Sequence, residues 1–452
     1  MHRAFILAVL AVLPLAAQPN VVLIMADDMG YECISSNGGA SYETPVFERI
    51  ARQGMRFSNC YSQPVCTPSR IKLMTGKYNW RNYRAFGRME KGERTFAHLM
   101  REAGYATGLT GKWQLWGGPP AAKSGMSPAE AGFDEHIHWA YNFELSEEEL
   151  RRYASAGPPG SKQTSRFWHP GIIKNGKYLH TSTADYGPDI FSDFALDFIE
   201  RHRNERFFLY YPMVLTHGPF VATPRSDVVT NETKFKSDTK HFADMVSYTD
   251  FLVGRLIDHV RRMGIAGNTL VLFTGDNGTD RRIQSMLGER TVRGRKAFPE
   301  DAGTHVPMFA WWPGQVPAGL VSSDLIEFSD FFATLADLTG RPVRDLEHVD
   351  GRSFLPLLLG GAGEPRTSIF VHYDRDPSLD EVPFPRIRFA RTKRYKLYSD
   401  GRYFDVPHDW HEQSPIEVED LTVEQHAIRL RLQRVLDSMP AWNPRGGGAV
   451  DR

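Results

Sequence analysis

The residues with the clearest chemical potential are the segment Cys66-Thr67-Pro68-Ser69-Arg70 and the run Ile71 to Gly76 that follows it directly. No second cysteine stands at the spacing of a metal or redox pair with Cys66, and no nearby histidine offers a general base for a thiol nucleophile. Ordinary cysteine chemistry therefore does not explain this segment. The plain alternative is a buried structural cysteine in a proline-containing turn, so the rest of the chain has to decide.

Two pairs of oxygen-bearing side chains each follow an apolar run. Asp27-Asp28 comes after residues 20–25, and Asp276-Asn277 comes after residues 269–274. Carboxylate and amide oxygens are the ligands that Ca²⁺ and Mg²⁺ prefer, whereas zinc sites normally contain histidine or cysteine. Taken alone, an Asp-Asp pair at the end of a strand is more often a helix N-cap or a turn than a metal site. Together the two pairs predict one site for a hard divalent cation.

The elements that must position these residues alternate between strands and helices. Predicted strands are 20–25, 105–110, 207–215 and 269–274. Predicted helices are 44–54, with Thr44 as N-cap, 95–102 and 242–263, the last with Met245, Leu252, Leu256 and Val260 on one face. The candidate polar residues follow the carboxyl ends of strands, where open parallel sheets place their ligand sites. The expected fold class is α/β, with a large, mostly parallel sheet sandwiched by helices.

The pattern changes near residue 360. Residues 360–365 are predicted as a linker. Short strands are predicted beyond it at 368–372, 386–392, 394–399 and 402–406, followed by a helix over 422–437. We therefore expect a catalytic domain over 18–360, a smaller C-terminal α+β subdomain with a short antiparallel sheet over 361–445, and a tail over 446–452. The Pro/Gly/Ser-rich stretch 157–165 is expected to be a surface loop.

The first 17 residues combine a short basic start, an apolar run and the small residues Ala16-Ala17, which is typical of a signal peptide. The run is shorter than the roughly 20 apolar residues of a spanning helix, so we expect an exported, periplasmic or secreted protein without stable membrane insertion. Lys+Arg and Asp+Glu both number 54, so no overall field favours nucleic acid as a partner. The sequence leaves the oligomeric state open.

Six segments resemble, in order, the signature segments of the sulfatase family, over nearly the whole chain after residue 17. They are Ala26-Asp27-Asp28, Cys66 to Gly76, Thr110-Gly111-Lys112-Trp113-Gln114-Leu115, Thr216-His217-Gly218-Pro219-Phe220, Asp276-Asn277-Gly278, and Arg293-Gly294-Arg295-Lys296 with the stretch 300–307. The resemblance implies an alkaline phosphatase-like fold and the hydrolysis of sulfate esters.

The resemblance also implies the chemistry of the site. Cys66 would be converted by a formylglycine-generating enzyme to a formylglycine aldehyde, whose hydrate is the nucleophile. One divalent cation, Ca²⁺ with Mg²⁺ as the alternative, would be held by the modified Cys66 together with Asp27, Asp28, Asp276 and Asn277. If Cys66 is modified, Cys33 and Cys60 remain, either as a disulfide or as two free buried thiols.

Further roles follow from the same resemblance. Arg70 would steady the hydrate, and Lys112 would contact both the hydrate and the sulfate. Lys296 and His217 would face the ester oxygen, and either of them would protonate the leaving alkoxide. The cation and the two lysines would neutralise charge on the sulfuryl oxygens.

Gln114 departs from the family pattern, which usually has histidine at this position. A carboxamide hydrogen-bonds the hydrate but cannot accept the proton that is removed when sulfate is expelled, so we expect another group to serve as the base. In the later stretch, Asp301, Ala302 and His305 replace the glutamate, glycine and arginine of the family, with altered packing as the expected effect.

The sequence favours an exported sulfatase acting on a sulfated small molecule or saccharide, with a carbohydrate sulfate as the expected substrate. One alternative is a phosphate or phosphonate ester hydrolase of the same superfamily, because these substrates are also tetrahedral anions. Another is a catalytically impaired binder of sulfated glycans, which Gln114 suggests. Candidates for a sugar subsite, each with core packing or plain surface exposure as the alternative, are Trp80, Arg81, Tyr83, Arg84, Trp116, Trp139 and Tyr141.

Overall fold

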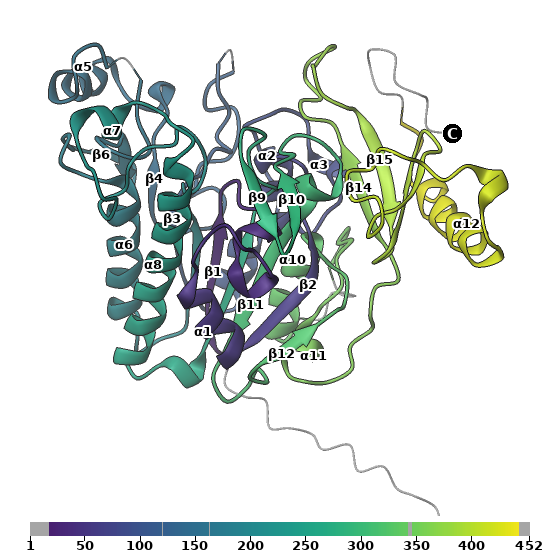
Figure 1. Ribbon diagram of the computed structural model, residues 1–452. Coiled ribbons are helices and arrows are strands. Elements are labelled where there is room, and N and C mark those ends of the chain that lie inside the picture. The colour runs from purple at the N-terminus through teal and green to yellow at the C-terminus, as the bar shows by residue number, and fades with distance from the viewer. Residues whose placement is uncertain (1–17, 120, 162, 342–345, 443–452) are drawn as a thin grey trace, which may run out of the picture.

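The structure is a computed structural model that describes residues 18–119, 121–161, 163–341 and 346–442. The predicted signal peptide over 1–17 and the tail over 446–452 lie outside the described residues. The described part forms an 11-stranded sheet, a two-stranded hairpin and a four-stranded sheet (Figure 1). None of the described helices has the length and apolar character needed to cross a membrane.

The large sheet has parallel strands at its centre. Its strands lie in the order β12 (Leu320–Ser322), β2 (Met55–Tyr61), β11 (His305–Trp311), β8 (Thr269–Gly275), β1 (Asn20–Ala26), β7 (Phe207–Pro212), β3 (Ala106–Gly111), β4 (Glu135–Trp139), β5 (Ile172–Lys174) and β6 (Lys177–Leu179), with β13 (Ile326–Glu327) also paired to β2. Strands β8, β1, β7, β3 and β4 run parallel, whereas β11 is antiparallel to both neighbours. The expected mostly parallel sheet is confirmed. The strand expected over 207–215 ends earlier, at Pro212, which has no N–H for the ladder.

Helices cover both faces of this sheet because its central strands are apolar on both sides. In β1, Val22 and Ile24 belong to a core shared with α1 (Pro45–Gln53), α6 (Gly187–Arg201) and α8 (His241–Arg262). The alternate residues Val21 and Leu23 belong to the opposite core, shared with α2 (Cys66–Thr75), α4 (Phe96–Glu102) and α10 (Ser329–Leu338). The continuous apolar strand is therefore buried on both faces of the sheet, as expected for a sheet sandwiched by helices.

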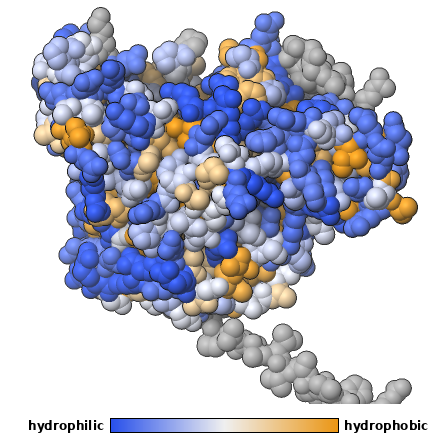
Figure 2. Space-filling model, in the orientation of Figure 1, coloured by the Kyte–Doolittle hydropathy of each residue, from blue (hydrophilic) through white to orange (hydrophobic). Residues whose placement is uncertain are grey.

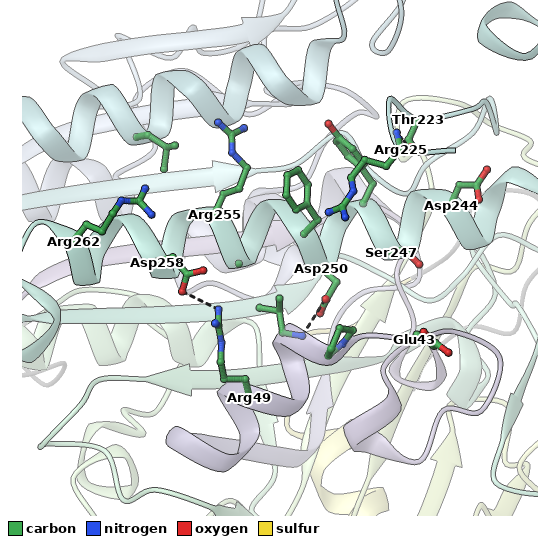
Figure 3. A pocket seen from close by; sticks show the side chains of 16 residues that line it. Glu43, Arg49, Thr223, Arg225, Asp244, Ser247, Asp250, Arg255, Asp258 and Arg262 are labelled. Carbon is green, nitrogen blue, oxygen red and sulfur yellow. Dashed lines mark hydrogen bonds and ion pairs between the residues drawn. The ribbon is translucent and has the colours of Figure 1, made fainter. Parts of the chain in front are cut away.

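The N-terminus of α1 is capped differently from the expectation. The Thr44 side chain makes no cap hydrogen bond and instead accepts the N–H of Ser35 (2.9 Å). The Asp250 carboxylate of α8 accepts the first free N–H groups of α1, from Val46 (3.0 Å) and Phe47 (2.9 Å), and a groove of about 810 Å³ runs beside this contact (Figure 3). A carboxylate replaces the hydroxyl cap because α8 packs directly against α1.

The C-terminal sheet consists of β14 (Ile369–Tyr373), β15 (Ile387–Arg391), β16 (Tyr395–Tyr398) and β17 (Tyr403–Asp405), which are antiparallel in chain order. The strands lie where the sequence predicted them, to within one or two residues at each end. One face packs against α12 (Val423–Asp437), whereas the other packs against Val65 and Cys66. The hairpin is formed by β9 (Gln284–Leu287) and β10 (Arg290–Arg293), and the shorter helices are α3 (Asn79–Asn82), α5 (Glu147–Ala156), α7 (Asn231–Phe235), α9 (Asp301–Thr304) and α11 (Leu355–Leu358).

Candidate active site

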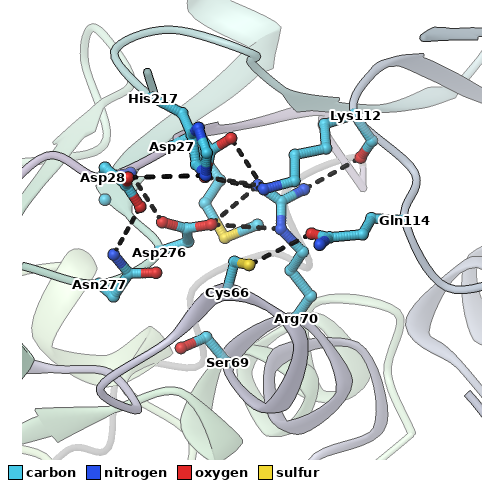
Figure 4. A network of polar contacts seen from close by, with 12 residues as sticks. Asp27, Asp28, Cys66, Ser69, Arg70, Lys112, Gln114, His217, Asp276 and Asn277 are labelled. Atoms are coloured by element: carbon cyan, nitrogen blue, oxygen red, sulfur yellow. Dashed lines mark hydrogen bonds and ion pairs between the residues drawn. The ribbon is translucent and has the colours of Figure 1, made fainter. Parts of the chain in front are cut away.

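Four neighbouring parallel strands bring the predicted site residues to one edge of the sheet. Asp27 follows β1, Asp276 follows β8 and Lys112 follows β3, whereas His217 lies in the loop after β7. These strands are adjacent in the order β8, β1, β7, β3, so their carboxyl ends meet. The residues that Figure 4 places around this edge include Asp27, Asp28, Cys66, Arg70, Lys112, Gln114, His217, Asp276 and Asn277, and Lys296 joins them through Asp28.

Two glycines allow the chain to approach this edge closely. Gly111, directly before Lys112, has φ +121°, and a Cβ there would lie 2.0 Å from the carbonyl oxygen of Pro212. A Cβ on Gly278, directly after Asn277, would lie 1.9 Å from the carbonyl oxygen of Ala302. Only glycine fits at either position, which explains the glycines of the T-G-K and D-N-G segments.

The oxygen ligands predicted from the sequence form a single buried cluster. Asp27, Asp28, Asp276 and Asn277 have no exposed surface. The Asn277 side-chain N–H donates to Asp28 (2.8 Å), but its Oδ1 has no hydrogen-bond partner among the described residues. Oxygens of Asp27 and Asp276 and Sγ of Cys66 lie within 4.8 Å of one another. An unpartnered buried amide oxygen beside three carboxylates fits a hard divalent cation.

Lysines and an arginine contact these carboxylates directly. Lys112 Nζ donates to both oxygens of Asp27 (2.9 and 2.8 Å), and Lys296 Nζ donates to Asp28 (2.6 Å). Arg70 donates to Asp276 through Nε (3.2 Å) and one terminal nitrogen (2.9 Å). Arg70 is therefore oriented by a candidate metal ligand.

A fourth cation, Arg166, was not found from the sequence. It donates to Asp27 (3.2 Å), and its guanidinium carbon lies 4.0 Å from the centre of the Trp139 ring. It follows the stretch 157–165, expected to be only a surface loop. A single arginine after a polar loop carries no spacing signal, so only the path of the loop reveals it. Four cationic side chains consequently face three carboxylates, and the excess charge attracts anions.

Burial and neighbouring charges shift the pKa values of the three aspartates in opposite directions. Burial raises the pKa of Asp27, but Lys112 and the other cations outweigh it and hold this pKa well below its usual range. Burial raises the pKa of Asp28, and burial together with repulsion from Asp27 raises the pKa of Asp276 to about 7. A divalent cation among these groups would favour their ionised forms.

The nucleophile candidate begins a helix. Cys66 is the first residue of α2, where the helix dipole favours negative charge. The Ser69 hydroxyl accepts the N–H of Gln63 (3.1 Å) and ties the preceding turn to the helix. The Cys66 thiol donates to Oε1 of Gln114 (3.2 Å). The nucleophile candidate is therefore in contact with the residue that stands in place of the usual histidine. This helix was not predicted because all its residues are buried and no amphipathic period exists.

His217 lies beside the same cluster, with Nε2 3.8 Å from an Asp28 oxygen. Burial and the positive charges of Arg166 and Lys296 hold its pKa well below the usual value. The negative charge of a bound sulfate ester would oppose this effect and favour the protonated imidazole.

Two of the seven candidate sugar-binding residues, Trp116 and Tyr141, line a cavity of about 740 Å³ that reaches Gln114. Phe86 and Phe143 complete its aromatic lining; nothing in the sequence had singled them out. The other five residues are not part of this lining: Trp80, Arg81, Tyr83, Arg84 and Trp139. Arg81, for example, pairs with Asp350 (2.8 Å).

Cys33 and Cys60 are free buried thiols in this structure and do not form a disulfide with each other.

A comparison with models of known protein families identifies the family of this chain. A family model described as "Sulfatase" matches residues 19–341. The chain belongs to the sulfatase family. A second model, "N-sulphoglucosamine sulphohydrolase, C-terminal", matches residues 294–438 of this sulfatase and thus includes the C-terminal sheet and α12. The chain is accordingly a sulfuric ester hydrolase.

Named relatives cover most of this sulfatase. It is 31% identical to arylsulfatase A of Homo sapiens over 88% of this chain and 78% of that protein. It is 31% identical to N-acetylgalactosamine-6-sulfatase of Mus musculus, over 85% and 75%. It spans 64% of the arylsulfatase of Hemicentrotus pulcherrimus, with 28% identity over 78% of this chain.

Solved structures share the fold. One is Ps i-CgsB in complex with a neocarrahexaose, with a TM-score of 0.72, 24% identity, and coverage of 93% of this chain and 92% of that chain. Another is BT4656 in complex with its substrate D-glucosamine-2-N,6-O-disulfate, with a TM-score of 0.70, 21% identity, and coverage of 93% and 97%.

Proposed function

We propose that this sulfatase hydrolyses sulfate esters of saccharides, with formylglycine derived from Cys66 as the nucleophile and one divalent cation, Ca²⁺ with Mg²⁺ as the alternative. One observation carries the proposal. Three buried carboxylates, an unpartnered amide oxygen and four cationic side chains converge on a cysteine at the start of a helix. A site that only needed a structural cysteine would have no use for this charge arrangement.

Asp27, Asp28, Asp276 and Asn277 would hold the cation. When bound, it would polarise a sulfuryl oxygen and promote ionisation of the nucleophile. Lys112 and Lys296 would neutralise charge on the other sulfuryl oxygens, because their Nζ atoms already contact the inner carboxylates.

Other side chains would orient the reacting groups and move protons. Arg70, fixed by Asp276, would steady the hydroxyl groups derived from Cys66. His217 or Lys296 would protonate the departing sugar oxygen. Gln114 would orient the nucleophile by hydrogen bonding, as it does with the present thiol (3.2 Å), without accepting a proton.

A saccharide is the substrate that the surroundings support best. The aromatic cavity beside Gln114 offers ring faces of Trp116 and Tyr141, which suit the apolar face of a sugar. A named relative is an N-acetylgalactosamine-6-sulfatase, and a protein of the same fold was solved with a sulfated glucosamine. Export through the signal peptide over 1–17 would expose the enzyme to such substrates. The proposal also includes a catalytic domain over 18–360, a C-terminal subdomain over 361–445 and maturation by a formylglycine-generating enzyme.

Peptide mass spectrometry tests the nucleophile directly. Trypsin releases residues 57–70, which contain both Cys60 and Cys66, so fragmentation has to locate the change. We expect an aldehyde at Cys66 and an intact thiol at Cys60 in protein from its native host. An intact thiol at Cys66 in that protein contradicts the proposal.

A substrate panel tests the reaction class. We expect sulfate release from defined sulfated saccharides and from an aryl sulfate, with a higher kcat/KM than for the matching phosphate monoester and phosphonate ester. A higher kcat/KM for the phosphorus esters would instead assign a phosphate or phosphonate hydrolase. Tight capture of a sulfated glycan without sulfate release from any substrate would assign a glycan binder.

A further inference from the structure

A strongly cationic cavity of about 530 Å³ lies beside the site. Its cationic lining residues are Arg281, Arg282, Arg293, Arg295, Lys296 and Arg375. Asp280 is the one acidic residue among the described lining. Val65, directly before Cys66, also lines it, so this cationic cavity borders both the nucleophile helix and Lys296.

Carboxylates of the protein neutralise only half of these cations. Arg282 pairs with Asp280 (2.9 Å), Arg295 pairs with Glu300, and Lys296 donates to Asp28 (2.6 Å).

The other three have no such partner. Among the described residues, no carboxylate pairs with Arg281, Arg293 or Arg375. Arg293 donates only to the carbonyl oxygen of Arg281 (3.2 Å). Guanidinium groups gathered in one cavity repel one another, and an oxyanion between them would remove that repulsion.

Aromatic rings hold two of these arginines in place. The guanidinium carbon of Arg375 lies 3.9 Å from the centre of the Phe384 ring, and that of Arg281 lies 5.8 Å from the same ring. Arg281 also lies 5.1 Å from the Phe298 ring centre. Stacking leaves the N–H edges of a guanidinium free for bidentate contacts with sulfate or carboxylate.

The aromatic cavity on the Gln114 side has a different charge. Its lining includes Glu144 and Asp376, and its arginine, Arg88, pairs with Glu90 (2.7 Å). An additional anionic group is therefore disfavoured there and favoured beside Lys296.

We infer that the cationic cavity is a subsite for a second oxyanion, sulfate or carboxylate, of the same substrate, so that this enzyme prefers polyanionic saccharides over singly sulfated ones. The inference rests on the proposed function, because it assigns the second anion to a substrate of that site. Arg281, Arg293 and Arg375 are the specificity-determining residues.

The test compares two double variants of equal charge. Arg281→Ala/Arg375→Ala removes two cavity cations, and Arg52→Ala/Arg203→Ala removes two exposed cations elsewhere. The probe is a heparin-derived hexasaccharide, with binding measured by calorimetry on chains that also carry Cys66→Ala to prevent turnover. Kinetics on 4-methylumbelliferyl sulfate, which has one anion, are measured on chains that retain Cys66.

We expect the cavity variant to bind the hexasaccharide about tenfold or more weakly, because charge-assisted hydrogen bonds to two arginines are lost. Added NaCl should weaken binding more steeply in the parent than in this variant. The KM and kcat for the aryl sulfate should stay within about twofold of the parent, because a singly charged substrate has no second anion to place beside Arg281 and Arg375. An unsulfated heparosan hexasaccharide, whose anions are carboxylates, shows which oxyanion the cavity binds. If the cavity variant also binds this hexasaccharide more weakly than the parent, the bound group is a carboxylate. If both bind it equally, the bound group is a sulfate.

Equal hexasaccharide affinity of the cavity variant and the control variant would overturn the inference. Thermal unfolding checks that both variants fold, and Arg293→Ala, at an exposed residue, provides a second variant for which we expect weaker hexasaccharide binding. Absence of aryl sulfate hydrolysis by the parent would count against the proposed function alone, because hexasaccharide binding decides the subsite separately.

Discussion

Several residues at the site hold a backbone conformation that side chains normally avoid. Asp28, Gln114 and Ala297 have φ values of +60°, +55° and +70°. Such left-handed conformations cost about 1 kcal/mol or more each and persist only where the surrounding structure imposes them. Asp28 is a candidate ligand, Gln114 contacts Cys66, and Ala297 follows Lys296. At these three positions the strain helps to fix the direction of a side chain at the site.

The role of His217 can be tested through the leaving group. Protonation matters little when the leaving group is a stable nitrophenolate, but it matters greatly for a sugar alkoxide. We expect His217→Ala to lower kcat about 100-fold or more on a saccharide sulfate and less than about tenfold on 4-nitrophenyl sulfate, measured by sulfate release. Equal losses on both substrates would exclude His217 as the general acid and leave Lys296.

Gln114 should contribute orientation only. Its amide makes one hydrogen bond to residue 66, so Gln114→Ala should lower kcat by less than about tenfold in steady-state assays. Lys112→Ala is the comparison, with an expected loss of about 100-fold or more, because this lysine neutralises transition-state charge. A loss for Gln114→Ala as large as that for Lys112→Ala would show a direct catalytic role.

At the scale of elements, the C-terminal sheet supports the site from outside the large sheet. Val65 and Cys66 pack against Val371 and Phe389 of its inner face. The Tyr373 hydroxyl donates to the carbonyl oxygen of Ala297 (2.9 Å), next to Lys296. The C-terminal sheet thus holds the nucleophile helix and the Lys296 loop together, although it contains none of the predicted site residues.

An ion pair joins this sheet to the large one. Arg391 of β15 donates to Asp301 at the start of α9, and Asp301 also lies 3.2 Å from Nδ1 of His305. Arg391 stacks over the Tyr61 ring at 4.0 Å. The replacements Asp301 and His305, which depart from the family pattern, are therefore parts of one inter-sheet contact.

This ion pair makes a pH-dependent contribution to stability. Burial raises the pKa of Asp301, but Arg391 and His305 outweigh it and hold this pKa below its usual range. The stabilisation is therefore present above the unfolded-state pKa, near 4, and is lost as the pH falls below it. We expect Arg391→Met to lower the free energy of unfolding by about 3 kcal/mol at pH 7, with the difference shrinking only as the pH falls below about 4 in denaturant titrations.

Arg394→Met is the matched control for this prediction, because its partner Asp405 lies on the same sheet but the arginine side chain is 51% exposed. We expect a smaller change there. An equal effect of both variants at pH 7, or no pH dependence for Arg391→Met, would contradict the assignment.

At the scale of the whole molecule, equal numbers of acidic and basic residues leave no net charge, and the face in Figure 2 is mostly hydrophilic. Positive charge is nevertheless concentrated in the site and in the cationic cavity beside it. Attraction of an anionic substrate is therefore local, and added salt should screen it.

Binding of the cation should stabilise the whole chain. Free Ca²⁺ at about 100 times its Kd should add about 2.7 kcal/mol to the free energy of unfolding, visible as a higher Tm relative to protein in EDTA. Asp276→Asn should remove most of this shift, because it removes a buried ligand charge. Asp258→Asn, which breaks the ion pair with Arg49 away from the site, should keep it. A Ca²⁺-induced shift that survives Asp276→Asn would place the cation elsewhere.

The sequence by itself determined the central strands, α8, the C-terminal strands and the polar residues at the strand ends. Continuous apolar runs and the glycines of T-G-K and D-N-G are local signals, because burial and backbone conformation act within a few residues. The helix that begins at Cys66 was missed, because a helix buried all round has no period to detect.

Only the tertiary structure decided which distant residues meet. Arg166 joins the site from a loop, Asp250 replaces Thr44 as the cap of α1, and Arg281 and Arg375, from separate segments, share the Phe384 ring. Such contacts depend on the path of the chain between elements, and a charged residue in a loop has the same local sequence pattern whether it faces solvent or a buried carboxylate.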